Sequence, residues 1–304
     1  MSPADNLTRP EFRAAGTDLS ERRRSGVSRG PLLDIAAPSG VETEPDGGLR
    51  LGALTTVAAL AADPALRAGY PGLAAAAAGL ATPQIRRMAT LGGNIAQRNR
   101  CWYFRNPDIA CLKKGGDACP ARGGNSLYAV AFDSAPCVAP HPSTLAAALL
   151  AYDARLDTDR RRGLSIAEAL GDGRASSTET ALEPGELITA VLLPPPSPNE
   201  RAAYKRAIGR AHAEWPLVEL VVRADVEDGA FARLRLVAGG VAPVPLRLHA
   251  AEAAAFGKPV AAETFLAVAA ASREGANPLP QSGYKLDLLH GLVRDLLEAV
   301  TART

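Results

Sequence analysis

The sequence predicts an α+β fold in which a larger N-terminal domain, residues 1–195, precedes a small C-terminal domain, residues 199–304. Two observations predict the small domain: alternating apolar runs at 217–222 and 231–238 flank a short turn, and apolar residues recur at helical spacing over 284–299. A third observation separates the two domains, because the proline-rich stretch 194–198 is typical of a stiff linker. We therefore expect an antiparallel sheet with helices after the linker.

Shorter elements are expected before the linker. Glycine and proline separate short strands at 12–19, 32–35 and 49–54. Helices are expected at 55–62, with Thr55 or Thr56 as the cap, and at 73–80, where Pro83 follows. A further helix and strand are expected at 145–152 and 187–193, and two more helices after the linker at 248–255 and 262–271.

Composition excludes several classes of protein. The 34 basic and 32 acidic residues among 304 leave a formal net charge of +2, without the concentrated basic face that nucleic-acid binding needs. Arginine runs at 22–24 and 160–162 are predicted to be solvated turns. No apolar run approaches the roughly 20 residues of a membrane span, and the first residues lack an export signal.

Two turns rich in small residues are candidate ligand sites. The first comprises Ala14, Ala15, Gly16, Thr17, Asp18 and Leu19, and the second runs from Thr90 through Gly93 and Asn94 to Ile95. Successive backbone N–H groups in such turns can form a concave anion site, although each alone is also compatible with an ordinary turn. The two together indicate an extended ligand.

All four cysteines fall within the glycine-rich loop 98–138. Nine, seven and seventeen residues separate Cys101, Cys111, Cys119 and Cys137, and no C-x-x-C pair occurs. This spacing leaves an iron–sulfur cluster, zinc, disulfides and free thiols open. None of the four histidines forms a metal-binding pattern; His141, with Ser143 two residues later, either positions a hydroxyl at a ligand or simply starts a helix.

The motifs in combination resemble one family. Seven short runs resemble, in the same order, those of FAD-binding subunits of molybdenum hydroxylases, most of all those of the periplasmic aldehyde oxidoreductase type. These runs are 14–19, 90–95, 100–104, 141–143, 184–188, 204–205 and 238–243. The resemblance implies a two-lobed PCMH-type FAD-binding domain followed by the small α+β domain. It also implies a [4Fe–4S] cluster held by the four cysteines.

The resemblance also implies a role and an assembly. A large subunit with a molybdopterin cofactor would oxidise the substrate, a small subunit with [2Fe–2S] clusters would relay electrons, and the FAD of this chain would pass them to an unknown acceptor. Residues 14–19 would hold the FAD pyrophosphate, while Thr90, Gly93, Asn94 and Ile95 would contact the flavin side, with Leu187 and Lys205 near the isoalloxazine ring or the ribityl chain. The compartment expected is the cytoplasm, or the periplasm by co-export with a partner that has the signal.

Three departures from the family pattern define the alternatives. Ala15 replaces a glycine, Thr144 replaces an acidic residue after the His-Pro-Ser run, and only eleven residues precede Phe12. One alternative is a scaffold subunit of the same complex without flavin. The other is a zinc-stabilised binding module.

Overall fold

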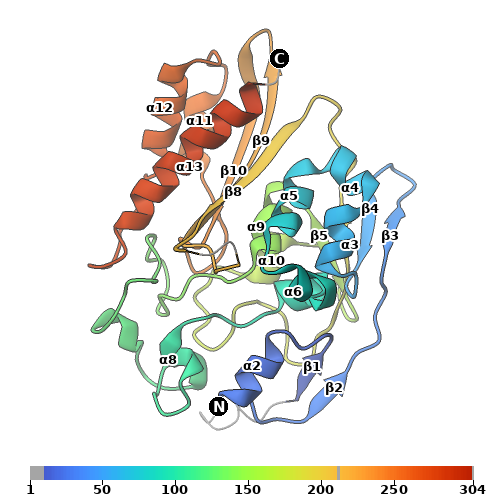
Figure 1. Cartoon of the computed structure of the whole chain (residues 1–304), viewed down its shortest axis with the longest axis vertical. Coiled ribbons are helices and arrows are strands. Elements are labelled where there is room, and N and C mark those ends of the chain that lie inside the picture. The colour runs from blue at the N-terminus through green and yellow to red at the C-terminus, as the bar shows by residue number, and fades with distance from the viewer. Residues whose placement is uncertain (1–9, 211–212, 303–304) are drawn as a thin grey trace.

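The computed structural model describes residues 10–210 and 213–302, so His212 lies outside the described residues. Two antiparallel sheets with helices form the body of the molecule, and a small N-terminal unit lies beside the cysteine loop at the opposite end from the C-terminal helices (Figure 1). The predicted α+β class is confirmed. Within the described residues, no helix is both long enough and apolar enough to cross a bilayer.

The first sheet has five strands in the order β3-β4-β7-β5-β6. Their bounds are β3 Val41–Thr43, β4 Leu49–Gly52, β5 Arg155–Thr158, β6 Leu164–Ser165 and β7 Ile188–Leu193. All of these pairs are antiparallel. Because β7 lies between β4 and β5, the segment just before the linker completes a sheet begun some 140 residues earlier in the chain.

Seven short helices belong to the same lobe as this sheet, and their starts follow from local chemistry. They are α3 Val57–Ala62, α4 Pro64–Gly69, α5 Pro71–Gly79, α6 Pro83–Met88, α7 Leu91–Ile95, α9 Thr144–Ala151 and α10 Ile166–Leu170. Proline is the first residue of three of them, where its missing N–H costs nothing. The predicted cap Thr56 is present, and its side chain accepts from the Ala59 N–H.

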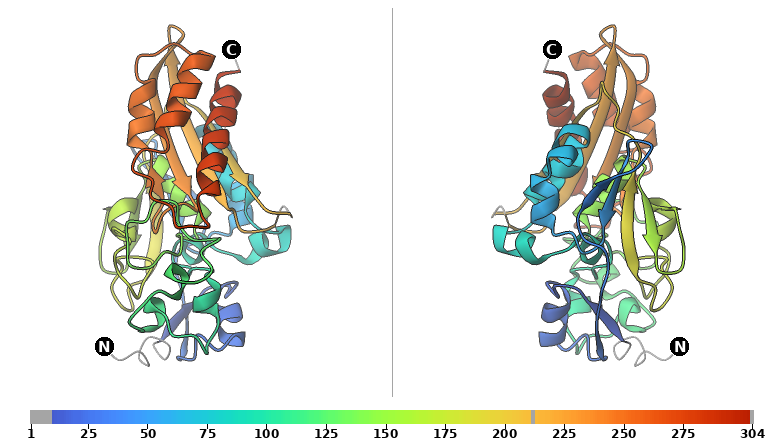
Figure 2. Two further views of the ribbon diagram at one scale, coloured as in Figure 1. Left: turned by 90° about the vertical axis from the view of Figure 1, so that its left-hand side faces the viewer. Right: turned by 90° about the vertical axis from the view of Figure 1, so that its right-hand side faces the viewer.

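The second sheet, in the order β11-β10-β9-β8, forms the centre of the C-terminal domain. Its strands are β8 Arg201–Ala207, β9 Val218–Glu227, β10 Ala230–Gly239 and β11 Leu246–Arg247, followed by α11 His249–Ala255, α12 Ala262–Ala271 and α13 Tyr284–Thr301. Figure 2 shows α11–α13 on one face of the long strands and helices of the first lobe on the other. The sheet is therefore covered on both faces.

Alternate residues of β9 belong to different hydrophobic cores. Leu220 and Val222 pack in the core beneath α11–α13, whereas Val221 packs in the core shared with α5 and α9. A strand alternates its side chains between the two faces of a sheet, so both sets can be apolar. The sequence alternation predicted the hairpin, but both of its faces are buried.

The cysteine loop contains only short helices, α8 Trp102–Arg105, η1 Leu112–Lys114 and η2 Pro120–Arg122. Its later part is hydrogen-bonded to the C-terminal domain: the N–H groups of Ala131 and Phe132 donate to the Val241 carbonyl, and Ser282 Oγ donates to the Val130 carbonyl at 2.8 Å. Its first part contacts the N-terminal unit, through bonds described below.

The N-terminal unit is a parallel pair, β1 Glu11–Arg13 with β2 Leu32–Asp34, joined through the helix α2 Leu19–Arg24. The prediction of a solvated turn at 22–24 is wrong, because these arginines form the end of α2 and Arg22 is buried between Glu11 and Asp18. The arginine run at 160–162 does lie in the largely exposed turn between β5 and β6, as predicted.

Candidate functional site

The first predicted turn is built around the carboxylate of Asp18. Gly16 has φ +70, which a glycine adopts freely, whereas Ala15 is not among the residues with positive φ, so its methyl group introduces no strain. Asp18 pairs with Arg22 at 3.0 Å, with Arg105 at 2.7 Å, and with Arg100. Its side chain thus serves internal ion pairs.

A chain of hydrogen bonds links the first turn to the other two predicted motifs. Arg100, besides its pair with Asp18, donates to Gln97 Oε1 at 3.1 Å. Gln97 Nε2 donates to the Asn94 carbonyl at 2.9 Å, and Ser143 Oγ donates to Asn94 Oδ1 at 2.7 Å. The structure therefore brings both turns and the His-Pro-Ser run to one place.

The second motif is not an open turn but the short helix α7. Thr90 is its N-cap, and its hydroxyl oxygen accepts from the Gly93 N–H at 3.2 Å. The side chain of Ile95 lies in the first hydrophobic core. The prediction of a turn is wrong, because the Thr90 cap starts a short helix that continues through Gly92 and Gly93.

Two predicted residues lie apart from these motifs. Leu187 precedes β7, and its N–H donates to Asp159 Oδ1 at 2.9 Å. Lys205 is exposed and pairs with Asp295 of α13 at 2.5 Å. Since Tyr204, its neighbour in β8, faces the first core, Lys205 must face the opposite side of the sheet. Its predicted place beside the other site residues is not found.

A cavity of about 610 Å³ lies between the cysteine loop and the C-terminal domain. Aromatic side chains from both sides line it, namely Trp102 and Tyr128, which pack against each other at 5.4 Å between ring centroids, and Trp215. Arg100 also lines it, and its guanidinium lies over the Trp215 ring at 4.3 Å from the centroid. The size and the aromatic walls are typical of a site for a planar cofactor or a small molecule.

Two buried nitrogen-bearing side chains line the same cavity. His141 Nδ1 accepts from the Ser143 N–H at 3.3 Å, whereas its Nε2 has no hydrogen-bond partner in the described part of the chain. Burial lowers the pKa of His141 to about 4, although the Glu179 carboxylate opposes the shift, so the ring is neutral at pH 7 and Nε2 bears the proton. The second is Lys285, 1% exposed. Two buried nitrogen-bearing side chains therefore stand at the wall of the cavity.

The four cysteines are free thiols that line one small cavity, together with Phe104, Lys113 and neighbouring residues. The Cys137 thiol donates to Cys119, which lowers the pKa of Cys119 and raises that of Cys137, whose burial acts in the same direction. Burial raises the pKa of Cys101. Among the described residues, no three His, Cys, Asp or Glu side chains converge closely enough to hold a single metal ion.

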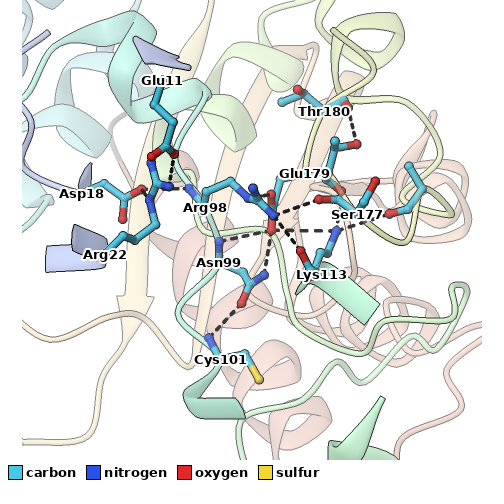
Figure 3. A network of polar contacts seen from close by, with 12 residues as sticks. Glu11, Asp18, Arg22, Arg98, Asn99, Cys101, Lys113, Ser177, Glu179 and Thr180 are labelled. Atoms are coloured by element: carbon cyan, nitrogen blue, oxygen red, sulfur yellow. Dashed lines mark hydrogen bonds and ion pairs between the residues drawn. The ribbon is translucent and has the colours of Figure 1, made fainter. Parts of the chain in front are cut away.

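A buried carboxylate that sequence reasoning missed, Glu179, is linked to Cys101 through Asn99 (Figure 3). It pairs with Arg98, lies 3.8 Å from Lys113 Nζ, and accepts from Asn99 Nδ2 at 2.7 Å. Asn99 Oδ1 in turn accepts from the Cys101 N–H at 3.0 Å. Burial raises the pKa of Glu179, but the two cations and the Asn99 hydrogen bonds outweigh it and hold that pKa below its usual value. A lone glutamate some 80 residues after Asn99 has no local signal that would reveal this role.

A second missed carboxylate is Glu219 of β9, also at the wall of the cavity. Its Oε2 accepts from Thr144 Oγ1 and from the Tyr204 hydroxyl, each at 2.8 Å. Burial raises the pKa of Glu219, because hydroxyl groups compensate a carboxylate less than cations do. Thr144, the residue that departs from the family pattern, therefore serves this internal network.

Two family models match the chain. The model described as the FAD binding domain in molybdopterin dehydrogenase matches residues 16–196, and the model of the CO dehydrogenase flavoprotein C-terminal domain matches residues 202–300.

Curated relatives and solved structures agree with these matches. The aldehyde oxidoreductase FAD-binding subunit PaoB of Escherichia coli is 36% identical over 82% of this chain and 80% of that protein. The putative xanthine dehydrogenase FAD-binding subunit XdhB of the same organism is 27% identical over 98% and 91%. A carbon monoxide dehydrogenase structure from Hydrogenophaga pseudoflava has a TM-score of 0.75 at 23% identity, over 99% of this chain and 92% of that chain.

Proposed function

This chain belongs to the family of FAD-binding subunits of molybdenum hydroxylases, as its motifs indicated, and on that premise we propose that it passes electrons through FAD within an aldehyde-oxidising complex. The substrate would be oxidised at molybdopterin in a large partner subunit. Electrons would then arrive through the [2Fe–2S] clusters of a small partner subunit and leave for an acceptor.

The observation that supports FAD most directly is the cavity between the loop and the C-terminal domain. Its aromatic walls suit a flat ring system, and Lys285 brings a side chain that can carry a positive charge to the same wall. When bound, FAD would accept electrons from iron–sulfur centres and deliver them to the acceptor. Asn94 and Ser143 would hold the two motifs in register beneath it, since each is already fixed by the other's hydrogen bond.

A [4Fe–4S] cluster on Cys101, Cys111, Cys119 and Cys137 is part of the proposal. The support is that four unpaired thiols from a 37-residue stretch line a single cavity, which scattered structural cysteines would not do. A cluster accepts thiolates from irregular loops such as this one. The Asn99 side chain fixes the backbone of Cys101, so one ligand position is already held by protein contacts.

The first experiment identifies the flavin. Acid should release FAD from the natively purified chain, as determined by chromatography, because two separate small-residue motifs suit a dinucleotide more than FMN. FMN, or no flavin at all, would contradict the proposal. Absence of flavin in a folded chain would favour the scaffold alternative.

The second experiment determines the metal. Anaerobic purification should yield about four iron atoms per chain if all four thiols bind one [4Fe–4S] cluster, and Cys111→Ser should lose most of that iron. Stoichiometric zinc would instead support the zinc-stabilised module.

The third experiment concerns partners and compartment. Native co-purification followed by mass measurement should recover the chain with a molybdopterin subunit and a [2Fe–2S] subunit. Fractionation of cells would then decide between the cytoplasm and a periplasm reached by co-export with a partner. Recovery of the chain solely as a monomer that oxidises aldehydes unaided would overturn the proposed role.

A further inference from the structure

We propose that Lys285 supplies the positive charge that sets the reduction equilibrium of FAD bound in the cavity, an inference that rests on the proposed function. Lys285 lies in the first turn of α13, and its side chain extends beneath the cysteine loop to line the cavity wall. The resemblance places Lys205 near the ring, but Lys205 is exposed, pairs with Asp295 of α13 and is not among the residues that line the cavity.

The contacts of Lys285 leave its charge uncompensated. Its Nζ donates to the carbonyl oxygens of Gly240 at 2.7 Å and Tyr128 at 3.2 Å. An ammonium has three donors, so one remains beyond these two bonds. In the described part of the chain, no carboxylate lies within 4.0 Å of Nζ. Burial lowers the pKa of Lys285 to about 7, so a negative charge in the cavity would favour the charged form of this side chain.

An isolated buried cation is costly unless something neutralises it. The carboxylates that line the same cavity are Glu214 and Glu219, and Glu219 is occupied by Thr144 and Tyr204 while Glu214 accepts from the Arg210 N–H. Arg100, the other cation in the wall, pairs with Asp18. Lys285 is therefore the cation of this wall that lacks an anion, and an anionic ligand in the cavity would provide one.

Reduced flavin is such a ligand. Two electrons and one proton convert the oxidised ring into its reduced anion, with the proton on N5 and the negative charge spread over N1 and the C2 oxygen. A nearby ammonium in a poorly solvated wall stabilises that anion more than the neutral oxidised ring, and so favours reduction.

The test compares Lys285→Gln with Lys205→Gln in the full chain loaded with FAD. Glutamine keeps a donor for the carbonyls of Tyr128 and Gly240 and removes only the charge, so a purely structural role of Lys285 would be largely preserved. Anaerobic titration against a dye of known potential should show the ratio of reduced to oxidised FAD falling at least about tenfold in Lys285→Gln. The same ratio should stay at the wild-type value in Lys205→Gln, and Lys285→Arg should restore most of it.

An unchanged ratio in Lys285→Gln that still binds FAD would overturn the inference and leave the proposed function intact. Absence of FAD from the folded wild-type chain would overturn both. If Lys285→Gln does not fold, sulfite provides a second measurement on the wild-type chain, because its lone pair adds to N5 and leaves the same negative charge on the ring. The adduct should form at sulfite concentrations far below those that free FAD requires, and equal concentrations would overturn the inference.

Discussion

The cysteine loop and the C-terminal domain lie against each other and are stabilised by different interactions. The C-terminal domain buries aliphatic and aromatic side chains from β8–β10 and α11–α13 in one core. The loop has only a small cluster, in which Val130 and Val138 are the larger fully buried members, and depends on ion pairs, backbone hydrogen bonds and thiols. The difference teaches that apolar periodicity defines one region, whereas contacts between residues far apart in sequence define the other.

The largest expected effect concerns the apolar region. Phe231 is fully buried and lies 6.3 Å from the Phe265 ring. Phe231→Ala should lower the free energy of unfolding of the C-terminal domain by about 4 kcal/mol, because it removes a large side chain from a packed core. Urea unfolding followed by circular dichroism measures this.

Phe256, which is 71% exposed, provides the matched control. Phe256→Ala should change the free energy of unfolding by no more than about 0.5 kcal/mol. Equal effects of the two substitutions would mean that apolar burial does not determine the stability of this domain.

The next largest effect is a substitution that should destabilise the cysteine loop and leave the C-terminal domain unchanged. Glu179→Gln keeps the shape of the side chain but leaves Arg98 and Lys113 without their buried counter-charge, which should cost about 3 kcal/mol. Hydrogen exchange should speed up across 98–138 and stay unchanged in β9 and β10. Glu183→Gln, whose parent carboxylate is exposed and pairs with Arg160, is the control and should have little effect. Equally faster hydrogen exchange in the loop and in β9 and β10 would contradict the view that the two regions are stabilised by different interactions.

The smallest expected effect is a difference in how stability depends on pH, because the pKa values of the two buried carboxylates are shifted in opposite directions. The pKa of Glu179 is lowered, so its stabilisation is complete above the unfolded value of about 4.3 and is lost as pH falls through its folded pKa. The pKa of Glu219 is raised, so its contribution is complete below about 4.3 and is lost as pH rises through its folded pKa.

Glu219→Gln keeps an acceptor for Thr144 and Tyr204 and should therefore stay within about 1 kcal/mol of wild type. It should also flatten the fall in stability as pH rises above about 4.3. Measuring the free energy of unfolding from about pH 2 to 8 for both variants tests this, because the window for Glu179 lies below about 4.3 and that for Glu219 above it. Identical pH profiles of Glu179→Gln and Glu219→Gln would contradict the assignment.

The same contrast explains how much could be predicted. The helix α13 was predicted nearly to its bounds, and the hairpin was predicted although β9 continues five residues beyond the expected 222, because helical spacing and alternation are local properties of the sequence. The four cysteines were identified by their clustering and do share a cavity. Glu179, Glu219 and Lys285 were missed, because burial of a single charged residue depends on what distant segments bring against it.

The most direct test of the FAD site uses the chain's two tryptophans, Trp102 and Trp215, which both line the cavity. Adding FAD to the flavin-free chain should quench tryptophan emission almost completely and saturate at one FAD per chain, because both indoles would lie against the ring. Trp102→Phe and Trp215→Phe should each retain the quenching of the remaining tryptophan. Stoichiometric binding of FAD, established by filtration, with tryptophan emission largely unquenched would place the flavin elsewhere and contradict the account.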